Sequence, residues 1–319
     1  MFGAGAVGGY LGAMLAAAGC DVSLVARGPH LAAIQQNGLT LWRNGKSQTY
    51  AIRATDSAVE LGPQDFVLVT LKAHALPGVA ADLRTLLGPD TAVVSAVNGL
   101  PWWYFHRLAS PIAERPLESV DPKGVIWKRI GPERAIGCVV YPSVEVSEPG
   151  VVRHLSDDKF SLGEPSGEKS ERVRSLAKAF IDAGLKAPVR PRIRDEIWVK
   201  LWGNLSFNPL SALTTATLDV LAYDEGIRAI ARTMMVEAQA VGEKHGIRFA
   251  VDVDQRIDAA GSVGAHRTSM LQDLEQGRPL EIAALVESVM EVARLLEQPT
   301  PTIDFIHALL RQRIQARGL

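Results

Sequence analysis

The sequence predicts an α/β protein whose N-terminal part is a doubly wound, mostly parallel sheet and whose C-terminal part is all-α. Three observations predict this fold. A glycine-rich turn opens the chain, strand-like apolar runs then alternate with helical stretches, and helical periodicity dominates after residue 191. Because 319 residues exceed what one hydrophobic core usually holds, we expect two domains, at residues 1–190 and 191–319.

Composition excludes several classes of protein. The 34 basic and 35 acidic side chains nearly cancel, so no electrostatic argument favours nucleic acid or an anionic membrane as a partner. Two cysteines, Cys20 and Cys138, are too few for a metal cluster or a disulfide scaffold and favour a reducing compartment. The apolar N-terminal run has no preceding Lys or Arg, as a signal peptide would have. We therefore expect a cytoplasmic protein without a metal.

The opening turn matches G-x-G-x-x-G, the pattern of Rossmann-type dinucleotide loops. It precedes a helical stretch at residues 10–18 and a strand-like run at residues 22–26. In such loops the first glycine allows the tight turn, the second admits a pyrophosphate and the third lets helix pack on strand. The cofactor-binding residues expected from this motif are Gly3, Ala4, Gly5, Ala6, Val7 and Gly8. Only two residues precede the loop, so we expect a short first strand and a clipped N-terminus or a misplaced start codon.

The following elements continue the alternation up to residue 190. Asn44-Gly45 is a type I′ hairpin signal between runs at 39–43 and 47–52. Further elements are expected as strands at 66–71 and 92–97 and helices at 76–87 and 171–183. Lys72 and Asn98 stand where two strands end, the edge at which open α/β sheets bind ligands. The alternative for each is a loop residue that faces water. Helices after residue 191 are expected at 195–205, 209–213, 225–245, 252–257, 280–296 and 302–317.

The residue after the second strand predicts the cofactor. An NAD enzyme usually has Asp or Glu there to bind the ribose hydroxyls, whereas this chain reads Ala26-Arg27-Gly28-Pro29. Arg27 is placed to pair with a 2′-phosphate, and no carboxylate competes. An arginine that merely opens the next helix is the alternative. We predict NADP(H).

A polar stripe marks the first helix of the C-terminal part. Lys200, Asn204 and Asn208 are spaced by four, so they share one helical face among bulky apolar neighbours. Such a stripe offers one proton donor and two carboxamides to a small polar substrate. The alternative is a lysine that snorkels at the edge of the core, with asparagines that cap the helix before Pro209.

A second polar stretch contains Ser269 and Asp273, again four apart, and precedes Glu281. Pro279 fits a first helical turn, which puts Glu281 early in the next helix, where the dipole favours a carboxylate. Taken alone, Glu281 is most simply a charge at the N-terminus of a surface helix.

Together these pieces resemble the ketopantoate reductases (2-dehydropantoate 2-reductases) over nearly the whole chain. The residues that carry the resemblance are the loop at 3–8, Leu71-Lys72, Val97-Asn98-Gly99, Lys200, Asn204, Asn208-Pro209, Ser269-Met270-Leu271-Gln272-Asp273 and Glu281. The resemblance implies NADPH-dependent reduction of a small 2-oxo acid to a 2-hydroxy acid. The family's product, pantoate, feeds pantothenate and coenzyme A synthesis.

The resemblance also implies roles for individual residues. Lys200 would be the general acid, and Glu281 would assist around the reacting oxygen or the cofactor. Substrate carboxylate and hydroxyl groups would be held by Asn204, Asn208 and Ser269. Lys72 and Asn98 would line the nicotinamide side, with Asn98 and Lys200 also touching the substrate.

Two departures from the family leave the substrate open. Trp102-Trp103-Tyr104-Phe105 and an irregular segment to about residue 124 stand where the family usually has a short helix. We expect this insert to cover the active site or to form a dimer contact, and to leave the fold alone. The alternative is a surface loop that packs on its own rings. Leu218 stands at a position where the family can carry a substrate-binding Asn.

Three alternatives therefore remain. The first is a reductase of another small 2-oxo acid on the same scaffold. The second is a protein that senses NADPH without catalysis, which the Lys200 and Glu281 pairing disfavours. The third is a β-hydroxyacid dehydrogenase, which the stretch at 269–273 does not fit.

Overall fold

The computed structural model describes residues 1–318, and the chain divides into two compact units. The first unit comprises Met1–Val97, Pro101–His106 and Lys123–Ile193. The second comprises Asn98–Leu100, Arg107–Pro122 and the chain from Arg194 onward. Two short segments from the first 190 residues thus belong to the second unit, and the domain limits given above stay a prediction.

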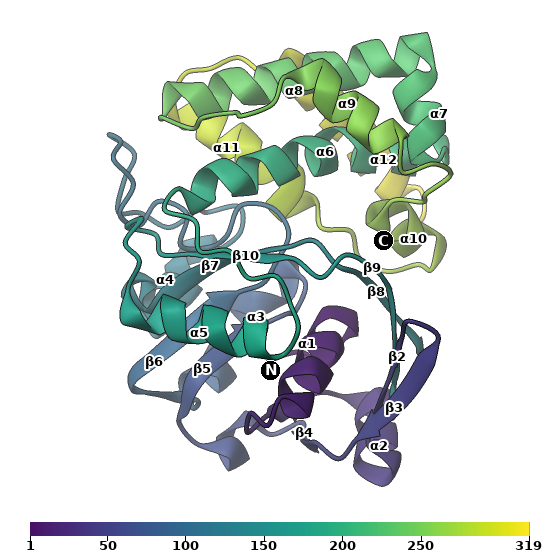
Figure 1. Ribbon diagram of the computed structural model, residues 1–319. Coiled ribbons are helices and arrows are strands. Elements are labelled where there is room, and N and C mark those ends of the chain that lie inside the picture. Colours follow the sequence, from purple (N-terminus) through teal and green to yellow (C-terminus); the bar gives the residue numbers. More distant parts are fainter. Residues whose placement is uncertain (319) are drawn as a thin grey trace. The chain divides into compact units, whose positions relative to one another are not determined.

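The first unit contains the expected doubly wound sheet (Figure 1). Phe2 bridges Val25 and Val69 in parallel, so it occupies the place of a very short first strand. The strands of this sheet are β1 (Ser23–Val25), β4 (Arg53–Thr55), β5 (Gln64–Val69), β6 (Leu87–Ser95), β7 (Ala135–Val140) and β10 (Phe160–Gly163). Their order is β4-β1-Phe2-β5-β6-β7-β10, parallel throughout except for β10. On its other side β10 is bridged in parallel by the segment that contains Lys186 and Val189. This arrangement confirms the fold class expected for the N-terminal part.

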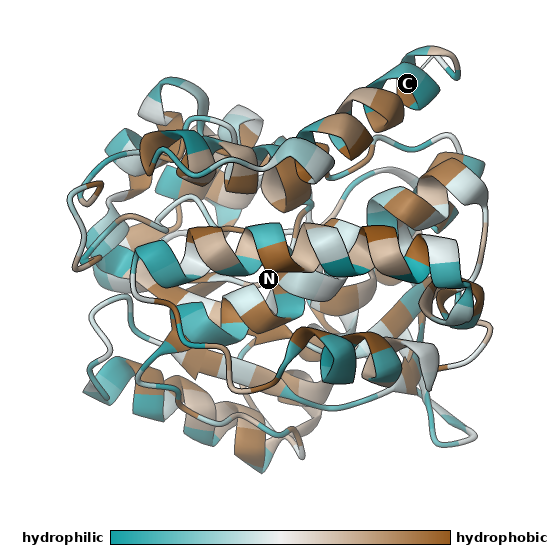
Figure 2. Cartoon of the chain, turned by 90° about the horizontal axis from the view of Figure 1, so that it is seen from above, coloured by the Kyte–Doolittle hydropathy of each residue, from teal (hydrophilic) through white to brown (hydrophobic). Residues whose placement is uncertain are grey.

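The helices of this unit bury apolar faces in its core. The α-helices are α1 (Ala6–Ala17), α2 (Gly28–Asn37), α3 (Leu76–Arg84), α4 (Val125–Ile130) and α5 (Glu171–Asp182). Short 3₁₀ turns lie at Ala58–Leu61, Ala73–Ala75, Pro122–Gly124 and Pro132–Arg134. Leu11 of α1 and Phe180 of α5 are fully buried. Figure 2 shows that hydrophobic and hydrophilic residues alternate along the helices of the chain.

A second sheet in this unit goes beyond the expected hairpin. Its order is β3 (Lys46–Tyr50), β2 (Leu39–Arg43), β9 (Val151–Ser156) and β8 (Ser143–Glu148). Asn44 (φ 52°) and Gly45 (φ 74°) both have positive φ, as a type I′ turn requires. Most residues of β8 are exposed, so this strand lacks the apolar run that predicted β5 and β6.

The second unit is helical. Its helices are α6 (Ile193–Thr214), α7 (Leu218–Tyr223), α8 (Glu225–Lys244), α9 (Val253–Gly261), α10 (Ser269–Glu275), a π-helical segment (Ala283–Glu287), α11 (Ser288–Leu295) and α12 (Pro301–Gln315). The expectation of two helices at 195–205 and 209–213 is wrong, because α6 continues through Pro209. A proline inside a helix costs one backbone hydrogen bond. Burial of Leu205, Phe207 and Leu210 around it keeps the helix intact.

The aromatic insert is part of the core, which corrects two expectations. Trp102, Trp103, Tyr104 and Phe105 are each at most 1% exposed. The Trp102 Nε1–H donates to Ser95 Oγ at 3.1 Å, within the first unit. Rings that are this deeply buried cannot form a dimer contact. Because large aromatic side chains gain most from burial, the insert supports the fold instead of leaving it alone.

Candidate active site

The glycine loop joins Phe2 to α1 at the carboxyl edge of the first sheet. Gly3 has φ +102°, and a Cβ built on it would lie 2.6 Å from Leu71 Cδ2. A Cβ on Gly8 would lie 2.2 Å from the Gly3 carbonyl oxygen, so the helix can approach the strand only with glycine there. By contrast, a Cβ on the exposed Gly5 meets no atom within 4 Å. Neighbouring atoms therefore fill the space beside Gly3 and Gly8, whereas the space beside Gly5 at the start of α1 is free. A bound dinucleotide requires this arrangement.

Sequence reasoning missed one residue that holds this loop. The Thr70 hydroxyl, directly after β5, donates to the Gly3 carbonyl at 2.5 Å, and its backbone N–H donates to the Phe2 carbonyl at 3.0 Å. In the sequence, Thr70 is a hydroxyl residue directly after the apolar run Phe66–Val69, and this position could have indicated its role. Thr70 fixes the turn from which the first helical N–H groups emerge.

A polar cluster fastens α1 to the second sheet. The Tyr10 hydroxyl donates to Asp158 Oδ1 at 2.5 Å, and Arg43 Nη2 donates to the same oxygen at 3.1 Å. Burial and the hydrogen bond to Asp158 raise the pKa of Tyr10. Burial alone would raise the pKa of Asp158, but the hydrogen bonds from Tyr10 and Arg43 outweigh it and hold the pKa below its usual range. The carboxylate therefore stays charged at neutral pH and keeps the start of α1 in place.

Arg27 lies at the position where sheets of this type bind the ribose of the cofactor. It precedes α2 immediately after β1, is exposed, and forms no ion pair with any residue between 1 and 318. No acidic residue occurs in the first turn of α2. An exposed guanidinium without a competing carboxylate suits a 2′-phosphate, which it can bind through paired hydrogen bonds.

Arg27→Ala should therefore weaken NADPH far more than NADH. Hydrogen bonds to charged groups contribute about 1.5–3 kcal/mol, so we expect the Kd for NADPH to rise about 10- to 100-fold. The Kd for NADH should change less than about twofold. Isothermal titration with each cofactor measures both values, with Arg174→Ala on α5 as the exposed-arginine control. Equal losses for the two cofactors would show that Arg27 is structural.

Lys72 lies at the same edge of the first sheet. It follows β5 and precedes the 3₁₀ turn Ala73–Ala75, and its carbonyl accepts the Ala75 N–H at 3.0 Å. Its side chain is half-buried. The first unit thus gathers the glycine loop, Arg27 and Lys72 at the carboxyl ends of neighbouring parallel strands.

The second unit joins Lys200 and Asn98 by a hydrogen bond. Lys200 Nζ donates to Asn98 Oδ1 at 2.8 Å, although 102 residues separate them in sequence. Lys200 is half-buried on α6, and Trp198 and Trp202 beside it are fully buried. A bonded ammonium at the edge of an apolar helix contrasts with the snorkelling lysine considered above.

Asn204 and Asn208 continue this stripe inside α6. Since the helix extends to Thr214, neither residue caps its end, which removes that alternative. Asn208 is buried at 5% exposure and Asn204 is half-buried. Two carboxamides at successive turns from Lys200 can donate to and accept from one small polar molecule.

Ser269 and Glu281 are set by α10 and the turn that follows it. Ser269 is the first residue of α10 and is exposed, while Thr268 caps the helix through the Leu271 N–H. Arg278 donates through Nε to buried Asp273 at 2.8 Å, which fixes the turn. Glu281 directly precedes the helix that starts at residue 282, so Pro279 lies outside the helix and not in its first turn as expected.

Between residues 1 and 318, no group of three or more His, Cys, Asp or Glu side chains is placed to hold a metal ion. Within those residues, every helix is too short or too polar to span a membrane.

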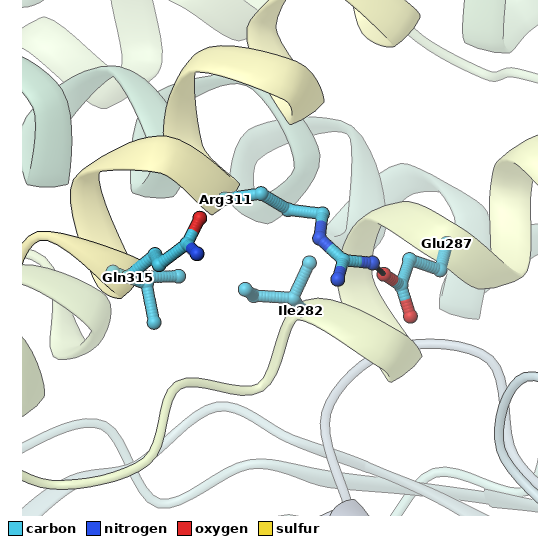
Figure 3. Close-up of a pocket in the computed structure, with 5 residues that line it drawn as sticks. Ile282, Glu287, Arg311 and Gln315 are labelled. Atoms are coloured by element: carbon cyan, nitrogen blue, oxygen red, sulfur yellow. Dashed lines mark ion pairs between the residues drawn. The ribbon is translucent and has the colours of Figure 1, made fainter. Parts of the chain in front are cut away.

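The second unit also contains a pocket with an ion pair of 3.7 Å between Arg311 and Glu287 (Figure 3). The residues that line it are Ile282, Glu287, Arg311, Ile314 and Gln315.

Comparison with known families matches both halves of the chain. Residues 1–167 match the family model "Ketopantoate reductase PanE/ApbA". Residues 192–315 match the model "Ketopantoate reductase PanE/ApbA C terminal".

Known proteins show the same similarity. A 2-dehydropantoate 2-reductase of Mesorhizobium japonicum is 59% identical over 319 residues, which cover 100% of this chain and 98% of the relative. The crystal structure of a putative ketopantoate reductase from Ralstonia solanacearum MolK2 has a TM-score of 0.95 at 44% identity, over 100% and 98% of the two chains. A ternary structure of D-mandelate dehydrogenase with NADH and anilino(oxo)acetate, at 22% identity and a TM-score of 0.84 over 100% of both chains, shares the fold.

Proposed function

This chain belongs to the ketopantoate reductase family, and from that premise we propose that it reduces 2-dehydropantoate to (R)-pantoate with NADPH. Enzymes of this family are oxidoreductases that use NADPH and act on a small keto acid. The observation that carries the proposal for this chain is the Lys200–Asn98 hydrogen bond of 2.8 Å, which holds an ammonium beside two carboxamides.

The first unit supplies residues that fit the cofactor. Its glycine loop is open at Gly5, where the pyrophosphate would lie against the N-terminus of α1. Arg27 would hold the 2′-phosphate, and Lys72 would line the nicotinamide side. When bound, NADPH supplies the hydride for the reaction.

The reaction requires a proton at the substrate's carbonyl oxygen, where negative charge develops as the keto carbon is reduced. We assign that proton to the Lys200 ammonium, so that an O–H bond forms as an N–H bond of Nζ breaks. General acid catalysis of this kind typically contributes about 10²–10⁴-fold. The bond to Asn98 Oδ1 limits the rotation of the lysine chain and aims its remaining N–H groups.

The other polar residues bind and orient the substrate. Asn204, Asn208 and Ser269 offer the amide and hydroxyl groups that a carboxylate and a hydroxyl need. Glu281 would assist at the reacting oxygen or the cofactor. The product would feed pantothenate and coenzyme A synthesis, and a homodimer and a cytoplasmic location stay predictions.

A panel of 2-oxo acids tests the substrate. NADPH oxidation by the purified chain, followed at 340 nm, should show the highest kcat/KM with 2-dehydropantoate. A higher kcat/KM with another acid would favour a reductase of that acid on this scaffold. The observation behind this alternative is Leu218, which stands where the family can carry a substrate-binding Asn. Tight NADPH binding without turnover of any acid would favour a sensor.

A further inference from the structure

The turn that carries Asn98 approaches another backbone segment of the second unit very closely. Gly99 has φ +83°, and a Cβ built on it would lie 2.1 Å from the Ala284 carbonyl oxygen and 2.5 Å from its carbon. The next residue, Leu100, donates its N–H to that oxygen at 3.0 Å. Only glycine permits this approach, so backbone contact alone places Asn98 relative to the helix that contains Ala284.

The helix at Ala284 is irregular where the contact occurs. Residues Ala283–Glu287 form a π-helical segment, and the Ser288 N–H bonds the Ala283 carbonyl instead of that of Ala284. The Ser288 hydroxyl is fully buried and donates to the Ala284 oxygen at 2.7 Å. Because the Ser288 N–H bonds to Ala283, the Ala284 carbonyl oxygen accepts the Ser288 hydroxyl and the Leu100 N–H. Such π turns are frequent at functional sites.

Contacts at both ends hold this segment in place. On the N-terminal side, the Glu281 carbonyl accepts the Leu285 N–H at 3.2 Å. On the C-terminal side, Glu287 Oε1 lies 2.9 Å from His307 Nε2 on α12. The same oxygen lies 3.7 Å from Arg311 Nη1, also on α12 (Figure 3). The π segment is thus a fixed platform that begins two residues after Glu281 and contacts the turn that carries Asn98.

We propose that Gly99 and Ser288 are positioning residues for the reaction: through the Ala284 carbonyl they fix Asn98, which in turn aims the Lys200 ammonium. This inference rests on the proposed function for the role of Lys200. A lysine side chain has four rotatable bonds, so the location of its ammonium depends on its partner. Displacements of about 1 Å in catalytic groups can cost about 10²-fold in rate.

Gly99→Ala tests the close approach, and Gly264→Ala is its matched control. Gly264 also belongs to the second unit and has φ +84°, but a Cβ there meets no atom within 4 Å. Both variants carry the same backbone strain, and only Gly99→Ala must move the Asn98 turn. We expect Gly99→Ala to lower kcat about 10- to 100-fold. The Kd for NADPH should change far less, because the glycine loop and Arg27 belong to the first unit. Gly264→Ala should keep the wild-type kcat.

Ser288→Ala tests the π platform, with Ser206→Ala as its control. Each serine is fully buried and donates to the carbonyl four residues earlier, but Ser206 does so within α6, to Trp202 at 2.8 Å. We expect Ser288→Ala to lower kcat about 3- to 10-fold, since one of the two bonds to Ala284 remains. Ser206→Ala should leave kcat unchanged even where its melting temperature falls equally.

A double-mutant cycle separates positioning from a general loss of structure. If Gly99 acts through Lys200, Gly99→Ala should lower kcat no further in a Lys200→Ala background. Full additivity of the two losses, or equal kcat for Gly99→Ala and Gly264→Ala, would overturn the proposal. Should the wild-type chain reduce no 2-oxo acid, the proposed function fails on its own. The positioning is then decided by a crystal structure of Gly99→Ala: a broken Lys200–Asn98 bond supports it and an intact bond overturns it.

Discussion

Lys200→Ala should lower the kcat for 2-dehydropantoate by about 10²–10⁴-fold, because the carbonyl oxygen loses its proton donor. The Kd for NADPH should change less than about twofold, since the glycine loop and Arg27 belong to the first unit. Stopped-flow measurement of NADPH oxidation gives the rate, and fluorescence titration gives the Kd.

Two further variants make this result specific. Lys200→Arg should recover little activity, because a guanidinium keeps its charge but is a poor proton donor near neutral pH. Lys244→Ala removes an exposed lysine of α8 in the same unit and should leave kcat unchanged. A Lys200→Ala protein with near-normal turnover and a lowered melting temperature would mean that Lys200 is structural.

Trp103→Ala should lower the free energy of unfolding by about 3–5 kcal/mol, the range for deletion of a buried aromatic ring. Trp103 is fully buried in the first unit, where a Cβ on Gly137 would lie 2.8 Å from its ring. Neighbours packed this tightly cannot collapse into the space that the ring leaves. Urea unfolding followed by circular dichroism measures the loss.

Trp42→Ala is the control for ring size. Trp42 lies on β2 and is 40% exposed, so we expect a loss below about 1 kcal/mol. Equal stabilities for Trp103→Ala and wild type would contradict the assignment of the aromatic insert to the core.

Apolar patterning made the sheet domain predictable. The centres of two apolar runs, Val67–Val69 and Ala92–Ala96, are buried throughout, so apolar residues occupy both faces of these strands and the sequence shows them directly. Asn44-Gly45 marks its turn by the need for positive φ. Strand β8 was missed because its side chains are mostly exposed. Pro209 suggested a helix end that tertiary burial overrides.

The candidate site was predictable only in part. Spacing by four places Lys200, Asn204 and Asn208 on one face of α6, but it does not reveal that Asn98 is the partner of Lys200. That contact depends on the close approach of Gly99 to Ala284 and on a π turn, and neither leaves a periodic signal. The burial of the aromatic insert was not predictable either, because a run of aromatic residues gives the same sequence pattern on a surface and in a core.

Deuterium transfer tests the central claim most directly. The purified chain is incubated with 2-dehydropantoate and NADPH that carries deuterium at C4 of the nicotinamide, in separate reactions for the two C4 epimers. We predict pantoate with deuterium at C2 from one epimer and none from the other, because the hydride leaves from one face of a fixed ring. Pantoate without deuterium from either epimer, or no pantoate at all, would contradict the assignment of this chain as a 2-dehydropantoate reductase.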